Sequence, residues 1–181
     1  AIMPVYDALY DSEALTHVTM AHEQGAAHAA DAYGIVTGRP GVCMATSGPG
    51  ATNLVTGIAD ADMDSDPMVA LTGQVPTAFV GNDAFQETDT VGVTRPVTKT
   101  NFFAGETDTV GATVADAIAY ATAGRPGPTL VDLPKDVTTG ETSAGGADDT
   151  PGPTPETDDE PPAADPEAVA RAARALASAD R

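Results

Sequence analysis

Fully apolar runs alternate with alanine-rich amphipathic stretches along the first 139 residues of the chain. Apolar runs bounded by turn residues predict buried strands, and the amphipathic stretches predict helices. Because the apolar runs are continuous, they are typical of a parallel sheet that helices cover on both faces. We therefore predict an α/β fold with three layers, a parallel sheet between two layers of helices. The expected strands are 17–20, 41–47, 67–73, 98–103 (at an edge) and 129–133, and the expected helices are 4–11, 24–37, 51–63, 84–91 and 110–123.

The character of the chain changes after this region. Residues 140–165 are rich in proline, acidic and small residues, and they have little to bury, so we expect a linker there. Asp165 as N-cap and Pro166 at the first helical position predict a helix that occupies 166–181. We interpret residues 1–139 as one domain and the last helix as the start of another. The chain also begins without an initiator methionine, so we expect it to be a fragment of a larger protein.

Charge limits the partners that the chain can have. Acidic residues outnumber basic ones by 27 to 8, which gives a net charge of −19. Such a surface repels nucleic acid and anionic lipid, so we expect neither as a partner. It fits a halophilic protein in a salt-rich cytoplasm, although an acidic mesophilic protein remains an alternative. No run of apolar residues predicts a membrane span, and we expect a cytoplasmic protein.

One carboxylate stands at a junction between a predicted strand and a predicted helix. Glu23 follows the candidate strand and precedes the small residues Gly25, Ala26 and Ala27, which leave room for a large group at the start of the helix. A half-enclosed glutamate there can carry a proton at neutral pH, and it predicts acid–base chemistry on a bound heterocycle. The alternative is a solvated carboxylate that only stabilises the helix dipole.

A glycine-rich turn lies between the next strand and helix. Residues 47–53 read SGPGATN, which matches neither a P-loop nor the GxGxxG fingerprint of dinucleotide-binding proteins. Its place at the end of a parallel strand favours a ligand site, and a tight turn without a ligand remains the alternative. The single cysteine, Cys43, excludes a disulfide within the chain, and the three histidines show no zinc-like spacing with it. We therefore predict no metal site in this chain.

Six ordered segments together resemble the thiamine-diphosphate enzymes, and most closely the large catalytic subunit of acetolactate synthase (acetohydroxyacid synthase). The resemblance covers about residues 1–139 and falls on the N-terminal domain of that family, which binds the pyrimidine ring of the cofactor. The segments are HEQGAAHAADAYG from His22, GVCMATSGPGATNLVTGIADA from Gly41, PMVALTGQVP from Pro67, DAFQET from Asp83, VTRPVTKTNFF from Val93 and GRPGPTLVDLPKDV from Gly124.

The resemblance implies a role for each matching residue. Glu23 is implied to be catalytic: it would hydrogen-bond the pyrimidine nitrogen N1′ and share its proton, which calls for a raised pKa in a dry pocket. The other implied contacts are with thiamine diphosphate (Gly48, Pro49, Gly50, Asn53, Ser65 and Gln86), with FAD (Arg125) and with the substrate channel (Pro76, Phe85, Lys99 and Lys135).

The resemblance also implies a reaction and an assembly. Two pyruvates, or pyruvate and 2-oxobutyrate, would condense with loss of CO2, as in branched-chain amino acid biosynthesis. FAD would be structural, and Mg²⁺ would bind with the diphosphate in a C-terminal domain that this sequence lacks. The family forms homodimers or homotetramers, with or without a small regulatory subunit. Because the active site forms between two domains, we predict that the isolated chain is inactive.

Two other interpretations stay open. Another thiamine-diphosphate carboligase or decarboxylase, such as a sulfoacetaldehyde acetyltransferase, fits most of the same motifs, whereas the glyoxylate carboligase resembles an exception with valine in place of Glu23. The chain could instead be a non-catalytic module from a split gene. Ala21 and Asp66 also depart from the family, since many relatives carry arginine and valine there.

Overall fold

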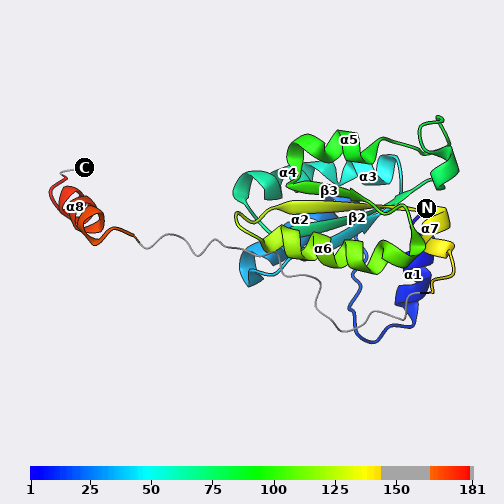
Figure 1. Cartoon of the computed structure of the whole chain (residues 1–181), viewed down its shortest axis with the longest axis horizontal. Coiled ribbons are helices and arrows are strands. Elements are labelled where there is room, and N and C mark those ends of the chain that lie inside the picture. Colours follow the sequence, from blue (N-terminus) through cyan, green and yellow to red (C-terminus); the bar gives the residue numbers. More distant parts are fainter. Residues whose placement is uncertain (144–163, 180–181) are drawn as a thin grey trace.

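Four parallel strands form the centre of the protein (Figure 1). The computed structural model describes residues 1–143 and 164–179. The strand order is β1-β2-β4-β3, and each neighbouring pair is parallel. All strands therefore end at the same side of the sheet, which we name the carboxyl edge, and begin at the opposite side, the amino edge. The strands are β1 (Gly41–Ala45), β2 (Met68–Gln74), β3 (Thr100–Phe103) and β4 (Pro128–Pro134).

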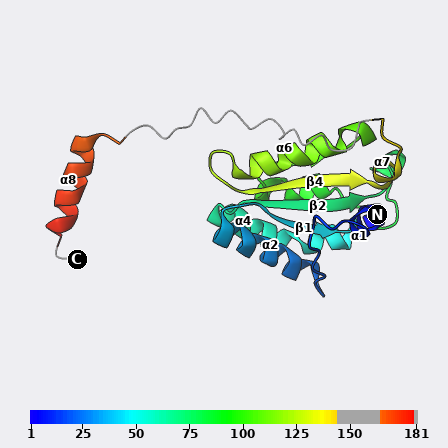
Figure 2. The ribbon, with the colours of Figure 1, turned by 90° about the horizontal axis from the view of Figure 1, so that it is seen from below.

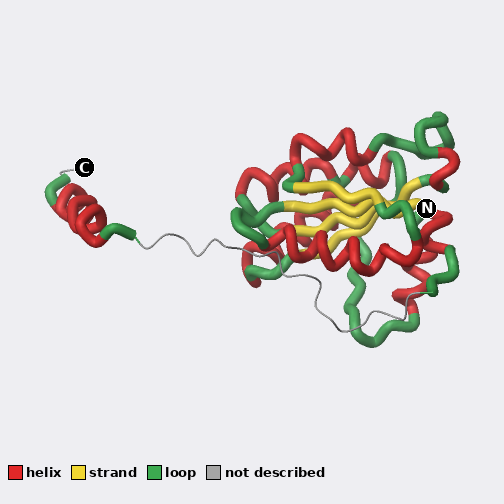
Figure 3. Tube along the Cα trace, in the orientation of Figure 1, coloured by secondary structure: helices red, strands yellow, loops and turns green. Residues whose placement is uncertain are grey.

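Helices cover both faces of this sheet, so the predicted three-layer α/β fold is confirmed (Figures 2 and 3). The helices α2 and α4 pack on one face, and α6 packs on the other. The α-helices are α1 (Met3–Tyr10), α2 (Glu23–Thr37), α3 (Pro49–Asn53), α4 (Val55–Asp64), α5 (Thr90–Thr94), α6 (Val110–Thr122), α7 (Lys135–Thr139) and α8 (Pro166–Ala177), and the 3-10 turns are η1 (Thr77–Phe79), η2 (Arg95–Val97) and η3 (Thr107–Thr109).

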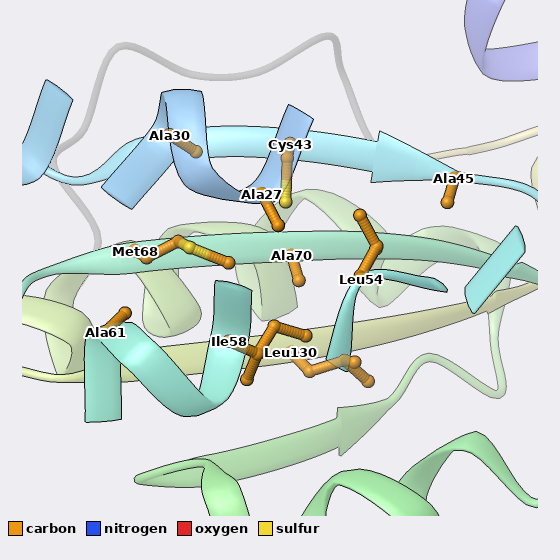
Figure 4. Packing of buried hydrophobic residues seen from close by; sticks show 10 residues of the cluster. All are labelled: Ala27, Ala30, Cys43, Ala45, Leu54, Ile58, Ala61, Met68, Ala70 and Leu130. Atoms are coloured by element: carbon orange, nitrogen blue, oxygen red, sulfur yellow. The ribbon is translucent and has the colours of Figure 1, made fainter. Parts of the chain in front are cut away.

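The core on the face of α2 and α4 consists largely of small side chains (Figure 4). A Cβ added at Gly57 of α4 would lie 2.6 Å from the Cβ of Ala27 on α2, so these two helices touch through backbone and alanine. This close approach fixes α2 firmly against α4. The cluster comprises Ala27, Ala30, Cys43, Ala45, Leu54, Ile58, Ala61, Met68, Ala70 and Leu130.

The opposite face has its own core beneath α6. Along β2, Met68 and Ala70 belong to the first cluster, whereas Val69 belongs to the second, which is the period-two alternation of a strand buried on both faces. This explains why β2 reads as a continuous apolar run. The second cluster comprises Ile2, Val69, Ala104, Ala117, Ala121, Val131 and Leu133.

The prediction of a strand at 17–20 is wrong. These residues are exposed and have no regular structure. Val18, the apolar residue that suggested burial, is 69% exposed. A strand needs a neighbouring strand to pair its backbone groups, and none of the four described strands pairs with this segment.

Two predicted helices have different boundaries. The expected helix at 51–63 is divided at the fully buried Leu54 into α3 and α4. The expected helix at 84–91 is a turn followed by α5, because Asp83 and Gln86 have positive φ angles and the Asp89 side chain caps the helix start that follows. Left-handed backbone at two positions is incompatible with a continuing α-helix.

The C-terminal predictions are tested only in part. Most of the proposed linker 140–165 lies outside the described residues. The predicted helix after it is present as α8, and the Asp165 side chain accepts a hydrogen bond from the Glu167 backbone N–H at 3.0 Å, as an N-cap should. Among the helices that the structure describes, none has both the length and the apolar character needed to cross a membrane.

Candidate functional site

Glu23 lies at the first position of α2, on the carboxyl edge of the sheet. The preceding residue, His22, is the N-cap, and its Nδ1 accepts a hydrogen bond from the Gln24 backbone N–H at 3.0 Å. Asn53, at the end of α3, donates from Nδ2 to Glu23 Oε2 at 3.1 Å. The first residue of α2 is therefore a partly buried carboxylate, and the last residue of α3 holds it in place.

In the chain without a cofactor, the pKa of Glu23 is lowered, and the raised pKa expected in a dry, occupied pocket stays a prediction. The backbone N–H of Glu23 and the amide of Asn53 both hold the pKa of Glu23 below its usual value, and partial burial opposes them. Hydrogen bonds to the ionised form favour that form. Glu23 is thus ionised, and among residues 1–143 and 164–179 the side chain that donates to it, Asn53, uses Oε2 and leaves Oε1 for another donor.

The glycine-rich turn lies directly against this carboxylate. A Cβ at Gly50 would come within 2.8 Å of Thr46 Cγ2 and 3.6 Å of Glu23 Oε1. Gly48 has φ +58°, and a Cβ there would lie 2.6 Å from the carbonyl oxygen of Gln86. A side chain at position 48 would overlap the Gln86 backbone, and one at position 50 would displace the Thr46 methyl group. The turn therefore lies against Gln86 at one glycine and close to Glu23 at the other.

The loop that carries Gln86 is held by a residue that the sequence did not single out. The carboxylate of Glu87 accepts hydrogen bonds from the backbone N–H groups of Gly81 and Ala84, the latter at 2.9 Å, and these bonds lower the pKa of Glu87. The loop positions Gln86 with φ +56° and leaves Phe85 87% exposed. The FQE string of the sequence includes Glu87, but nothing in its spacing indicated that Glu87 holds the loop that carries Gln86.

Pro76 and Lys135 also lie at the carboxyl edge. They follow the neighbouring strands β2 and β4, and the loops after these strands are joined because Asp136 accepts hydrogen bonds from the Thr77 backbone N–H at 3.0 Å and from Thr77 Oγ1 at 2.6 Å. Pro76 is partly buried, whereas Lys135 is exposed. This edge therefore presents a cation as well as the carboxylate of Glu23.

A buried polar network beneath this edge was also missed by the sequence reasoning. Asp132 of β4 is 1% exposed and accepts hydrogen bonds from Thr72 Oγ1 at 2.7 Å and Gln74 Nε2 at 2.9 Å. Gln74 Nε2 also donates to the Thr88 carbonyl at 2.9 Å, which connects β2 to the segment before α5. Burial raises the pKa of Asp132 to about 6, although both hydrogen bonds oppose the rise. The sequence signal for this network was Asp132 itself, an acidic residue inside an otherwise apolar strand.

Three residues predicted for the site lie at the opposite, amino edge of the sheet. Ser65 follows α4 and precedes β2, and it accepts a hydrogen bond from Arg125 Nε at 2.7 Å. Arg125 also donates to the Asp62 carbonyl at 3.1 Å and so caps the end of α4. Lys99 precedes β3, and its Nζ donates to the carbonyls of Tyr120, at 2.6 Å, and Ala123 at the end of α6. None of these contacts involves Glu23.

A comparison with known families decides what kind of protein this is. Residues 1–93, just over half of the 181 residues, match the model described as thiamine pyrophosphate enzyme, N-terminal TPP binding domain. The chain belongs to this family of thiamine pyrophosphate enzymes.

Individual relatives within the thiamine pyrophosphate enzymes are similar over a longer stretch. An acetolactate synthase of Mycobacterium bovis is 59% identical over 141 residues, which is 78% of this chain and 23% of the relative. The acetolactate synthase large subunit of Corynebacterium glutamicum is 59% identical over 78% of this chain and 22% of its own length. A probable acetolactate synthase large subunit of Methanocaldococcus jannaschii is 57% identical over 78% and 24%. The chain thus spans about a quarter of the length of these relatives.

The carboxyl edge of this thiamine pyrophosphate enzyme domain fits one end of the cofactor. A carboxylate with one oxygen beside glycine backbone can accept a hydrogen bond from a protonated heterocycle nitrogen, and Gly48 and Gly50 keep side chains out of its approach. The diphosphate and its metal ion need a second set of groups, namely carboxylate or carbonyl oxygens that coordinate the ion together with the phosphate oxygens. Within 1–143 and 164–179, no group of three metal-ligating side chains includes Glu23 or a residue of the turn.

Proposed function

We propose that this chain is the pyrimidine-binding part of an acetolactate synthase, the enzyme that condenses two molecules of pyruvate, or pyruvate and 2-oxobutyrate, with loss of CO2. One observation carries the proposal: Asn53 holds Glu23 so that its second oxygen lies beside the backbone of Gly50. The similarity to acetolactate synthases over 78% of the chain supports the choice among thiamine pyrophosphate enzymes.

The role that we assign to Glu23 is to hold a proton at the pyrimidine nitrogen N1′. Thiamine diphosphate, when bound, supplies the electron sink that stabilises the carbanion formed on loss of CO2. Glu23 is ionised in the chain alone, because two N–H donors stabilise its charge. Covering this edge with a ring and a second domain removes water, and desolvation raises a carboxyl pKa. Asn53 is a positioning residue in this scheme, since it orients the carboxylate.

The other proposed cofactor contacts fall into two groups. Gly48, Pro49, Gly50 and Gln86 lie with Glu23 at the carboxyl edge and would form the wall against which the pyrimidine ring rests. Ser65 and Arg125 lie together at the amino edge, where Arg125 would contact FAD. Mg²⁺ and the diphosphate would be held by a part of the protein outside these 181 residues.

Substrate would reach the carboxyl edge past Pro76, Phe85 and Lys135. The exposed ammonium group of Lys135 can pair with the carboxylate of a 2-oxo acid. We also propose Lys99 for the substrate channel. Because Lys99 lies at the amino edge, it would line a part of the channel that is at the opposite edge of the sheet from Glu23. We further propose that the whole enzyme is cytoplasmic and assembles as a homodimer or homotetramer, with or without a small regulatory subunit.

The test uses the full-length protein that contains this chain. Glu23→Gln should reduce kcat for acetolactate formation by about 100-fold or more, the usual size of a lost acid–base group. Glu13→Gln, which changes an exposed glutamate outside the site, should leave kcat unchanged. Activity of Glu23→Gln within a factor of two of the parent would refute the assignment.

Product analysis separates the candidate reactions. Incubation with pyruvate alone and with 2-oxobutyrate should give 2-acetolactate and 2-aceto-2-hydroxybutyrate. Acetyl phosphate formed from sulfoacetaldehyde and inorganic phosphate, with release of sulfite, would instead assign the chain to the alternative thiamine-diphosphate enzyme. The isolated 181 residues should form no acetolactate above a control without protein.

A further inference from the structure

We propose that His28, Asp31 and Asp60 form a binding site for a divalent transition-metal cation between α2 and α4. The inference does not depend on the proposed function, because these three residues take no part in it. It also departs from our expectation, drawn from the sequence, that the chain has no metal site.

The three side chains converge from two helices. One ligand atom from each lies within 4.8 Å of the others, and His28 Nδ1 is 3.4 Å from Asp60 Oδ2. His28 and Asp31 are three residues apart on α2, which places them on one face of the helix. Asp60 comes from α4, which contacts α2 closely at Gly57 and Ala27. The backbone thus fixes the separation of the ligands before any ion binds.

A second observation points to a missing ligand in the same place. Asp31 is 6% exposed, and its Oδ1 is buried without a hydrogen-bond donor among the described residues. Buried carboxylate oxygens in native proteins almost always have a partner, because leaving one unpaired costs its full desolvation energy. An ion bound to Asp31 and to the two more exposed groups would supply that partner.

The charges around Asp31 favour a cation. Burial is the main cause that raises the pKa of Asp31, the neighbouring carboxylates Asp66 and Asp60 add to the rise, and His28 is the one neighbour that opposes it. Asp66 also has a buried oxygen, Oδ2, without a partner. Three carboxylates around one imidazole therefore leave an excess of negative charge that a divalent ion would balance.

The ligand set indicates the class of metal. One imidazole and two carboxylates suit Zn²⁺, Mn²⁺ or Co²⁺, whereas Ca²⁺ and Mg²⁺ prefer sites made of oxygen ligands. Three protein ligands leave one or more positions for water on the exposed side, where His28 is 40% and Asp60 54% exposed. The ion would clip α2 to α4 and so stabilise the folded chain.

The experiment titrates the full chain, freed of metal by a chelator, with Co²⁺ and with Zn²⁺. Binding is followed by the visible absorption of Co²⁺ and by calorimetry for Zn²⁺, in about 0.5 M KCl with excess Mg²⁺ to occupy weak carboxylate sites. We expect one ion per chain and a higher Tm with Zn²⁺. His28→Gln and Asp60→Asn should each weaken binding by about tenfold or more, as loss of a ligand does.

Matched variants separate this site from general binding to an acidic surface. His17→Gln changes an exposed histidine elsewhere, and Asp64→Asn changes an exposed acid on α4, so both should bind like the parent. Absence of saturable binding, or equal loss in His17→Gln and His28→Gln, would overturn the proposal.

Asp31→Asn provides an independent readout, since the amide keeps the shape of the buried side chain. We expect a folded chain whose Tm no longer responds to Zn²⁺. If a proton shared between Asp31 and Asp66 satisfies these oxygens instead, the parent chain will show no response to Zn²⁺ either, and the metal site is refuted.

Discussion

Asn53 and Glu23 are 30 residues apart in the sequence and joined by one hydrogen bond of 3.1 Å, from the amide Nδ2 to the carboxylate Oε2. This bond connects the glycine-rich segment after β1 to the first residue of α2. It uses one oxygen of the carboxylate and leaves the other beside Gly50. The pair therefore orients the carboxylate on which the proposed function depends and, together with the Glu23 backbone N–H, keeps it ionised.

Removal of the Asn53 amide should raise the pKa of Glu23. The amide is one of two donors that stabilise the ionised carboxylate, so Asn53→Ala should shift the titration of Glu23 upward. NMR detection of the labelled Glu23 carboxyl carbon in the isolated chain measures this shift. Thr52→Ala, which changes an exposed neighbour of Asn53, serves as the control. An unchanged titration in Asn53→Ala would show that the bond is absent in solution.

Gly50→Ala should destabilise the chain, whereas Gly111→Ala should not. The new Cβ at position 50 would lie 2.8 Å from Thr46 Cγ2, and relief of that overlap should cost about 1 to 3 kcal/mol of unfolding free energy. Position 111 lies in α6 with open space around it, so alanine there should add about 0.5 to 1 kcal/mol. Urea unfolding of the two variants checks both signs. Equal effects would contradict the close packing of the turn against Thr46.

Asp31 should make the metal-free chain less stable as the pH rises from about 4 to about 6. Burial, Asp66 and Asp60 raise the pKa of Asp31 to about 6, and His28 opposes them. A raised pKa in the folded state means that the stabilising protonated form is complete below the unfolded pKa and is lost as the pH passes the folded one. The difference in unfolding free energy between the parent and Asp31→Asn should therefore change by on the order of 2 kcal/mol across this range. A constant difference would contradict the raised pKa.

Asp132→Ala should be among the more damaging substitutions in the sheet. It removes the acceptor of two buried donors, so Thr72 Oγ1 loses its acceptor and Gln74 Nε2 keeps only its hydrogen bond to the Thr88 carbonyl. We expect a loss of about 2 to 4 kcal/mol in unfolding free energy, with a smaller loss for Asp132→Asn, which keeps one acceptor oxygen. Thermal unfolding of the two variants measures the order. If Asp132→Ala proves as stable as the parent, the network contributes nothing.

Salt should stabilise the chain. The net charge of −19 creates repulsion in the compact state, and salt screens it. Tm should therefore rise as KCl increases from about 0.1 M to about 3 M, and the rise should be smaller when the exposed acids Asp7, Glu13 and Asp64 are replaced by their amides. A Tm that falls or stays level with KCl would favour the interpretation as an acidic mesophilic protein.

The sequence predicted the elements whose signals are local. The strands β1, β2 and β4 and the helices α2 and α6 lie within about two residues of their expected bounds, because apolar runs and glycine or proline stops are properties of single segments. The strand expected at 17–20 failed because pairing depends on a neighbour. The division at Leu54 depends on burial of that side chain, which no local pattern reveals.

The candidate site was predictable as a set of residues but not as an arrangement. The motifs named Glu23 and Asn53, which share a hydrogen bond, and Gln86, whose backbone lies beside Gly48. They also named Ser65, Lys99 and Arg125, which lie at the other edge of the sheet. The two sets of residues lie at opposite edges of the sheet because Asn53 and Gln86 follow strands, whereas the members of the other set precede them. A sequence motif alone does not report which edge of the sheet a residue reaches. The cluster with His28 was missed for a related reason: its third member, Asp60, comes from a different helix, so no spacing within one segment reports it.

The seam between α2 and α4 has a consequence for how this domain tolerates change. Where Ala27 meets Gly57, there is almost no side-chain volume to lose, so truncation can do little harm there. Harm comes from the opposite direction, since a single added methyl group at Gly57 has nowhere to go and would push apart the two helices that carry Glu23 and Asp60. A saturation scan of position 57 should therefore rank substitutions by bulk, with alanine, the smallest addition, least harmful and the large aromatic residues worst.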